Sequence, residues 1–110
     1  MDSLNVVTLT GFLERPPTIR AEGDTPRCSA TLRCPELGST GSTFTLYVPL
    51  DAWGKSAEAL GTLHAGTLVA VQGRLCWRKY TTKQGEHKSG LAVLVGKVNV
   101  LALPPAPDTS

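Results

Sequence analysis

Cationic and aromatic side chains alternate with apolar ones in the segment 68–80, LVAVQGRLCWRKY. If this segment is a β-strand, successive side chains point to opposite faces of the sheet. One face then carries Arg74, Arg78 and Tyr80, and the other carries the apolar residues. Cations beside an aromatic ring suit a polyanion that also carries flat rings, which describes a single-stranded nucleic acid. The pattern therefore predicts a nucleic-acid-binding face on this strand.

The distribution of charge supports this prediction, although the net charge of +2 is too small to decide anything. Five cations and a single acid, Glu86, lie between residues 74 and 88; the cations are Arg74, Arg78, Lys79, Lys83 and Lys88. A charge run of this kind is often only a solvated hairpin. Its interleaving with Trp77 and Tyr80 favours the anion-binding interpretation.

Catalytic and metal-binding patterns are absent from the sequence. We find no paired-carboxylate motif, no nucleophile elbow and no metal-ligand spacing. The three cysteines, Cys28, Cys34 and Cys76, form no CxxC pair, and His64 and His87 lie far in sequence from any pair of cysteines. Their odd number also argues against a disulfide framework. We therefore expect no enzyme, no metal and no cofactor.

The elements expected to position the basic face are mostly strands. Val, Thr and Leu-rich runs between Gly and Pro clusters predict five strands, at 4–13, 27–33, 43–50, 67–80 and 90–103. One short amphipathic helix is expected at 55–64, between the third and fourth strands. Pro49 should lie at a strand edge, because proline cannot donate a ladder hydrogen bond. The apolar last strand should be buried on both faces, in a core and in a subunit contact.

This order of elements predicts an all-β chain. Internal glycines at 11, 73 and 96 favour a sharply coiled sheet. Five strands with a helix between the third and fourth match the OB-fold, a Greek-key barrel that binds oligonucleotides or oligosaccharides. We expect one domain over residues 1–103 and a Pro-rich tail over 104–110. The N-terminal residues do not form a signal peptide and no apolar run is long enough for a membrane span, so we expect a cytoplasmic protein.

Several segments resemble bacterial single-stranded DNA-binding proteins. These are the opening strand 5–13, the segment WGKSAE at 53–58, and the run from 65 to 85 that contains GTLVAVQGRL and RKY. The resemblance covers residues 4–103 and implies a non-catalytic OB-fold that wraps single-stranded DNA. It also implies a homo-oligomer, for which we expect a tetramer, with a dimer as the alternative.

The resemblance also implies site residues. The stacking aromatic side chains would be Tyr47, Trp53 and Tyr80. The basic contacts with the DNA backbone would include Arg20, Lys55, Arg78, Lys79 and Lys88, and the strand pattern adds Arg74. Trp53 has an alternative role in packing the helix onto the barrel. By its strand parity, Trp77 is expected in the core or in a subunit contact rather than on DNA.

Three departures from the family pattern are visible. A family aromatic would fall near Gly38, and Tyr stands at positions 47 and 80, where relatives often have Trp. The sequence ends in PDTS and lacks the acidic, Phe-terminated peptide with which the family recruits other enzymes. This argues against recruitment of repair enzymes, though not against DNA binding.

We therefore expect sequence-tolerant binding of single-stranded DNA in support of replication, recombination or repair, close to the bacterial nucleoid. Two alternatives remain open. One is a dimeric primosomal replication accessory protein of the same superfamily. The other is an OB-fold that docks proteins and binds nucleic acid weakly.

Overall fold

The computed structural model describes residues 4–82 and 84–104, with the side chains of Glu22 and Tyr80 outside the described part. The elements along the chain are β1 (Val7–Leu13), β2 (Thr18–Glu22), β3 (Thr25–Leu37), β4 (Thr43–Trp53), α1 (Lys55–Gly61), β5 (Leu68–Thr81) and β6 (His87–Ala102). Of the expected C-terminal tail, only Pro104 is described.

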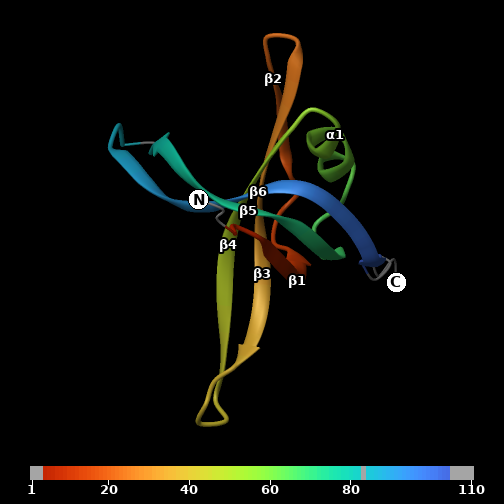
Figure 1. The fold of residues 1–110 in the computed structure, drawn as a ribbon, viewed down its shortest axis with the longest axis vertical. Helices are drawn as coiled ribbons and strands as arrows, with labels where there is room; N and C mark the ends of the chain where they lie inside the picture. Colours follow the sequence, from red (N-terminus) through yellow and green to blue (C-terminus); the bar gives the residue numbers. More distant parts are fainter. Residues whose placement is uncertain (1–3, 83, 105–110) are drawn as a thin grey trace, which may run out of the picture.

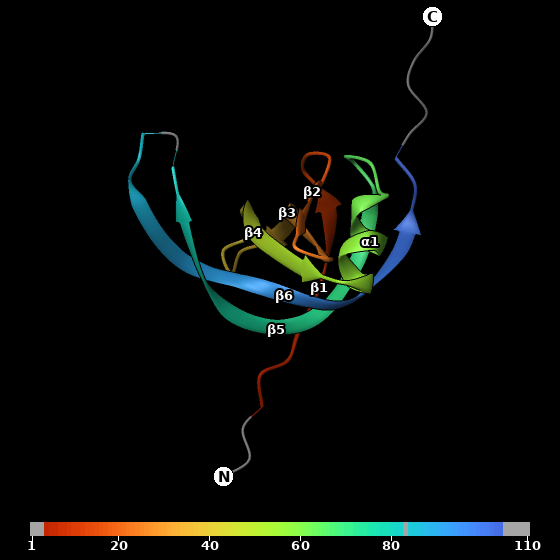
Figure 2. The same ribbon diagram turned by 90° about the horizontal axis from the view of Figure 1, so that it is seen from above.

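The strands close into a barrel. The sheet has the order β1-β5-β6-β4-β3-β2, and an additional pairing of β1 with β3 completes the ring. In Figure 2, β5 and β6 run side by side as one strongly curved ribbon beneath the other strands, and α1 lies inside this curve, next to the C-terminal half of β6. The expected OB-fold is confirmed, because five strands form the ring and the helix follows β4.

One strand was missing from the prediction. No strand was expected between residues 13 and 27, yet residues on either side of a turn at Gly23 and Asp24 pair in the β2–β3 hairpin. Gly23 has a φ of 64°, which permits this tight connection. The other bounds also differ: β3 and β4 extend to Leu37 and Trp53, so that the connection left between the strands expected at 27–33 and 43–50 shortens to 38–42.

The helix is also shorter than expected, since it ends at Gly61 rather than at residue 64. Gly61 lies against β2, where an added Cβ would come 3.0 Å from Cδ1 of Ile19. Ala57 and Leu60 are fully buried in the barrel core, which explains why the amphipathic pattern of this segment was visible in the sequence.

Gly73 is where β5 bends. A Cβ at this position would lie within 2.0 Å of the carbonyl oxygen of Leu94, so only glycine fits. The pairing with β6 shifts at the same place: Gln72 pairs with Lys97 and Gly73 with Val95, which leaves Gly96 as a bulge. The bend allows the outer halves of β5 and β6 to leave the barrel as a two-stranded arm (Figure 1).

One burial prediction, for Trp77, was wrong in part for this reason. Trp77 shares the strand parity of the core residues Val69 and Val71 but is 63% exposed, because it lies on the arm beyond Gly73. A core position for Trp77 is therefore excluded, while a subunit contact stays a prediction. Within the single chain β6 is not buried on both faces, since Leu91, Val100 and Leu101 are exposed; burial of its second face in a subunit contact stays a prediction. The prediction for Pro49 is confirmed: among the described residues, β4 pairs with β6 only at Leu50 and Asp51, so at Pro49 the strand is paired with β3 alone.

Candidate nucleic-acid interface

The outer face of β3 and β4 forms the central surface of the candidate interface. Strand alternation sends Cys28, Leu32 and Cys34 into the core and the intervening residues of β3 outward. Across the β3–β4 ladder, Arg27 stands opposite Trp53 and Arg33 opposite Tyr47. Directly opposed residues share a face. A cation therefore stands beside an aromatic ring at each end of this surface, Arg27 beside Trp53 and Arg33 beside Tyr47.

The rings on this face are accessible. Tyr47 is 60% exposed and Trp53 is 42% exposed. They are six residues apart on one strand, which corresponds to about 20 Å. The alternative role of Trp53 as a buried residue between helix and barrel does not fit this exposure. Both rings can offer a π-face to a ligand that lies along β4.

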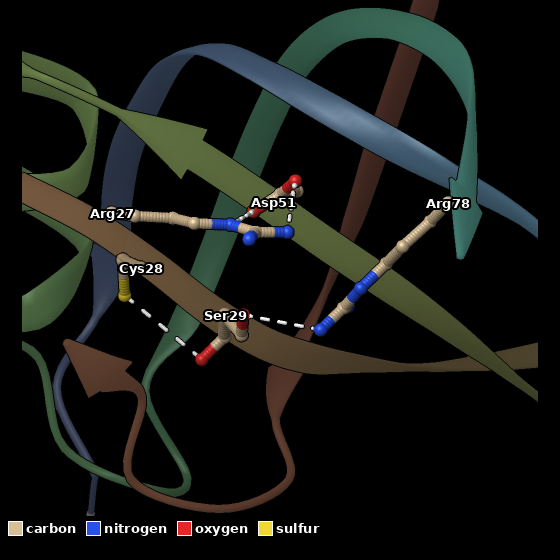
Figure 3. A network of polar contacts seen from close by, with 5 residues as sticks. All are labelled: Arg27, Cys28, Ser29, Asp51 and Arg78. Atoms are coloured by element: carbon tan, nitrogen blue, oxygen red, sulfur yellow. Dashed lines mark hydrogen bonds and ion pairs between the residues drawn. The ribbon is translucent and has the colours of Figure 1, made fainter. Parts of the chain in front are cut away.

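Arg27 is held by Asp51 on the neighbouring strand (Figure 3). Its Nε lies 3.1 Å from Oδ1 and its Nη2 lies 3.2 Å from Oδ2 of the Asp51 carboxylate. The Cζ of Arg27 is 4.9 Å from the centre of the Trp53 ring. Asp51 is buried, with 7% exposure, so its carboxylate depends on this charged partner. The three side chains form one packed unit on the face.

A similar unit stands at the other end of β3. Arg33 pairs with Glu14 through an Nε–Oε2 distance of 3.1 Å, and its Cζ lies 5.2 Å from the centre of the Phe12 ring. Both side chains of this ion pair are much more exposed than Asp51, and exposed pairs contribute little to stability.

Arg78 enters the same face from β5, opposite in direction to Arg27 (Figure 3). Its Nη2 donates to the Ser29 hydroxyl at 3.2 Å. Its Nε is buried and has no hydrogen-bond partner within the described residues. A cavity of about 230 Å³ adjoins it, lined by Pro49, Arg78, Gly90 and Leu91. Arg78 therefore combines a full positive charge with an unused donor beside an open space.

The tip of the β5–β6 arm carries a second cavity of about 490 Å³, lined by Lys79, Thr81, His87, Lys88 and Ser89. Lys88 lies 3.9 Å from Glu86, and Thr81 contacts the His87 ring at 3.3 Å. Its cationic lining suits a phosphate group.

Burial raises the pKa of the Cys28 and Cys34 thiols, and the nearby carboxylates of Asp51 and Glu36 add to this effect. Both thiols point into the core and are therefore structural. In the described part of the chain, no group of three or more His, Cys, Asp and Glu residues could hold a metal ion. Neither is any described helix long and apolar enough to cross a membrane.

The sequence profile described as the single-strand binding protein family matches residues 4–101. The chain belongs to this family. A curated single-stranded DNA-binding protein of Paenarthrobacter aurescens is 32% identical over an alignment 104 positions long, and the match covers 84% of this chain. The match covers 58% of that relative, so the chain spans a little over half of its length. Membership in this family confirms the resemblance described above to bacterial single-stranded DNA-binding proteins. It also confirms the expectation that the chain is not an enzyme.

The structure of this single-strand binding family member brings most of the expected site residues together. Arg20 on β2 is the cross-strand partner of Arg27 on β3, which in turn is the partner of Trp53 on β4. The three residues therefore lie side by side on one face. Arg74 and Asp51 are both paired with Leu94, which places Arg74 on the same face. Tyr80 is paired with Lys88 in the arm, but its side chain lies outside the described part.

Two expected residues lie apart from this face. Lys79 has the strand parity of Trp77, so it projects from the side of the arm opposite to Arg78. The cavity at the arm tip lies on that side as well, because Thr81, His87 and Ser89 of its lining share this parity. Lys55 is the first residue of α1 and lines a hollow with Gly96 and Lys97 of β6. Any contact of these two lysines with the ligand of a single-strand binding protein would require the strand to pass around an edge of the face.

Sequence reasoning did not single out Arg27, Arg33 and Asp51 as residues of the interface. Arg27 was assigned to a strand. Because the pairing of this strand with its neighbours was unknown, the residues that share a face with Arg27 could not be named. The signal that could have found the group is the alternation in β4, since Tyr47, Asp51 and Trp53 all share one parity. An acid at such a position in a face otherwise rich in cations predicts an ion pair.

Proposed function

We propose that the chain binds single-stranded DNA with little dependence on sequence, across the outer face of β3, β4 and β5. The observation that carries this proposal is the exposure of Tyr47 and Trp53 on the same face as Arg78. Every base has a π-face that can stack on such rings, while the cations neutralise phosphates. Arg20, Arg74 and Lys88 are the further cations that we assign to the DNA backbone.

Stacking alone gives a modest affinity. Each stacked base contributes about 1–3 kcal/mol. Tyr47, Trp53 and Tyr80 would then stabilise the complex by several kcal/mol before the entropy of ordering the strand is subtracted. The remaining affinity must come from phosphate contacts and from several domains that share one strand, because linked sites raise the effective concentration.

We propose that the chain acts as a homo-oligomer, with a tetramer as the expected form and a dimer as the alternative. Two features support self-association. Among the described residues, β1 pairs with β3 only at Phe12 and Leu13, so one edge of its first five residues is open to another strand. Apolar side chains are exposed close to this edge and on the arm; they are Val6, Leu75, Trp77 and Leu91.

In the cell, we place this activity with the nucleoid in the cytoplasm, where replication, recombination and repair expose single strands. The test is a competition between two DNA ligands of one sequence. A labelled oligo-dT bound to the protein should be displaced by single-stranded competitor at far lower concentrations than by the duplex. Equal competition by the duplex would contradict the proposal, since the rings can reach only unpaired bases.

A further inference from the structure

The guanidinium of Arg27 is fixed in a single plane. Its two hydrogen bonds to Asp51, at 3.1 and 3.2 Å, lie in that plane and act as a clamp. The guanidinium lies over the Trp53 ring, with 4.9 Å between Cζ and the ring centre. Arg27 is therefore held in one place on this face, in contrast to a solvated arginine that samples many rotamers.

The positive charge of Arg27 is already compensated. The Asp51 side chain is 9% exposed, and a carboxylate so deeply buried is costly unless it keeps its charged partner. A phosphate that bound Arg27 would have to compete with this carboxylate at the same donors. The pair adds almost no net charge to the face, so it has little attraction for the DNA backbone.

A flat, compensated guanidinium retains one useful property, because nucleobases stack on arginine planes as they do on aromatic rings. The Arg27 side chain is 26% exposed, and the Trp53 ring beneath it is partly exposed as well. We propose that Arg27 is a base-stacking platform layered on Trp53, with Asp51 as its positioning residue, and that it is not a phosphate contact. This inference rests on the proposed binding of single-stranded DNA.

Arg78 provides the matched contrast within the same face. It donates to a neutral partner, the Ser29 hydroxyl, and no ion pair is formed by it among the described residues. Its buried Nε–H has no acceptor there either. Arg78 therefore keeps a charge that no carboxylate compensates among the described residues, and the two arginines should respond differently to salt.

The test measures the affinity for oligo-dT over a series of salt concentrations. Each phosphate contact on a single strand contributes about −0.7 to the slope of log K against log[salt]. R78M should weaken binding and reduce the magnitude of the slope by about 0.7. R27M/D51N removes the clamped pair without changing the net charge. It should weaken binding at least about fivefold and leave the slope unchanged. R27K keeps the charge but lacks the plane, so the same loss is expected.

A rescue variant separates stacking from structural damage. R27Y/D51N supplies a flat ring without any charge and should recover most of the affinity lost in R27M/D51N. Unchanged affinity in R27M/D51N, a decrease of its slope like that of R78M, or no recovery in R27Y/D51N would each overturn the inference. These results are all distinct from failure of the proposed function, in which the wild-type protein itself would not bind oligo-dT.

Discussion

Asp51 on β4 binds Arg27 on β3 through both carboxylate oxygens, although neither residue is the direct cross-strand neighbour of the other. The ladder pairs Asp51 with Ser29 and Arg27 with Trp53, so the ion pair crosses the sheet diagonally. Arg27 thereby contacts both the Asp51 carboxylate and the Trp53 ring on the outer face. It also leaves a buried carboxylate that depends on a single β3 side chain for its charge compensation.

The first prediction concerns stability. R27A leaves the Asp51 carboxylate buried without its cation and should lower the free energy of unfolding by about 2–3 kcal/mol. This is less than the about 3–5 kcal/mol typical of fully buried pairs, because the Arg27 side chain is partly exposed. R27M/D51L, which removes both charges, should lie within about 1 kcal/mol of the wild type. Urea unfolding at fixed protein concentration measures both. An equal loss in the two variants would contradict a dependence of Asp51 on Arg27.

The second prediction concerns the bend in β5. G73A introduces a Cβ within 2.0 Å of the Leu94 carbonyl oxygen and should destabilise the barrel by about 1–3 kcal/mol or more. G90A is the matched control on β6, because an added Cβ there meets nothing within 4 Å. Its stability should stay within about 0.5 kcal/mol of the wild type. Thermal unfolding followed by circular dichroism compares the two, and equal midpoints would refute the close approach at Gly73.

A third prediction follows from the raised pKa of the Cys28 and Cys34 thiols. Unfolded thiols ionise near pH 8.5, whereas the native thiols keep their protons at higher pH. The native state then binds more protons than the unfolded state, so the free energy of unfolding should fall as pH rises above about 8.5. Urea unfolding at pH 7.5 and 9.5 under reducing conditions measures the fall. C76A should retain it, and C28A/C34A should lose most of it; an undiminished fall in C28A/C34A would show that other groups cause it.

A fourth prediction concerns the exposed apolar surface on the arm. W77E places a charge in this surface and should shift the protein toward smaller assemblies in light scattering. Binding of an oligonucleotide short enough for one domain should change little. Binding of a long strand should weaken, because domains that are no longer linked cannot share it. An unchanged mass for W77E would remove Trp77 from the proposed subunit contact.

Much of the fold followed from local patterns. Strand alternation and the glycines at 11 and 73 indicated a coiled five-stranded barrel, and the spacing of Ala57 and Leu60 indicated the helix. Such signals depend only on near neighbours in the sequence. The β2 strand was missed because its turn residues, Gly23 and Asp24, lie within a longer run of turn-forming residues. Within such a run, composition alone cannot show which two residues form the turn.

The interface was harder to predict than the fold. Tyr47 and Trp53 could be assigned to a face from their own strand. The roles of Arg27 and Asp51 depend on how β3 and β4 are paired, and pairing between distant segments is not encoded in either segment alone. The prediction for Trp77 failed for a different reason. Its parity was assigned correctly, but parity does not tell where a strand leaves the barrel, which is decided by the bend at Gly73.

The most direct test of the central claim is an equilibrium titration with oligo-dT that compares the wild type with Y47A/W53A at low and moderate salt. We predict tight, salt-dependent binding by the wild type. The double variant should fold normally but bind more weakly by about 2–6 kcal/mol, the contribution of two stacked bases. Equal affinity of the two proteins, or no binding by the wild type at low salt, would contradict the account.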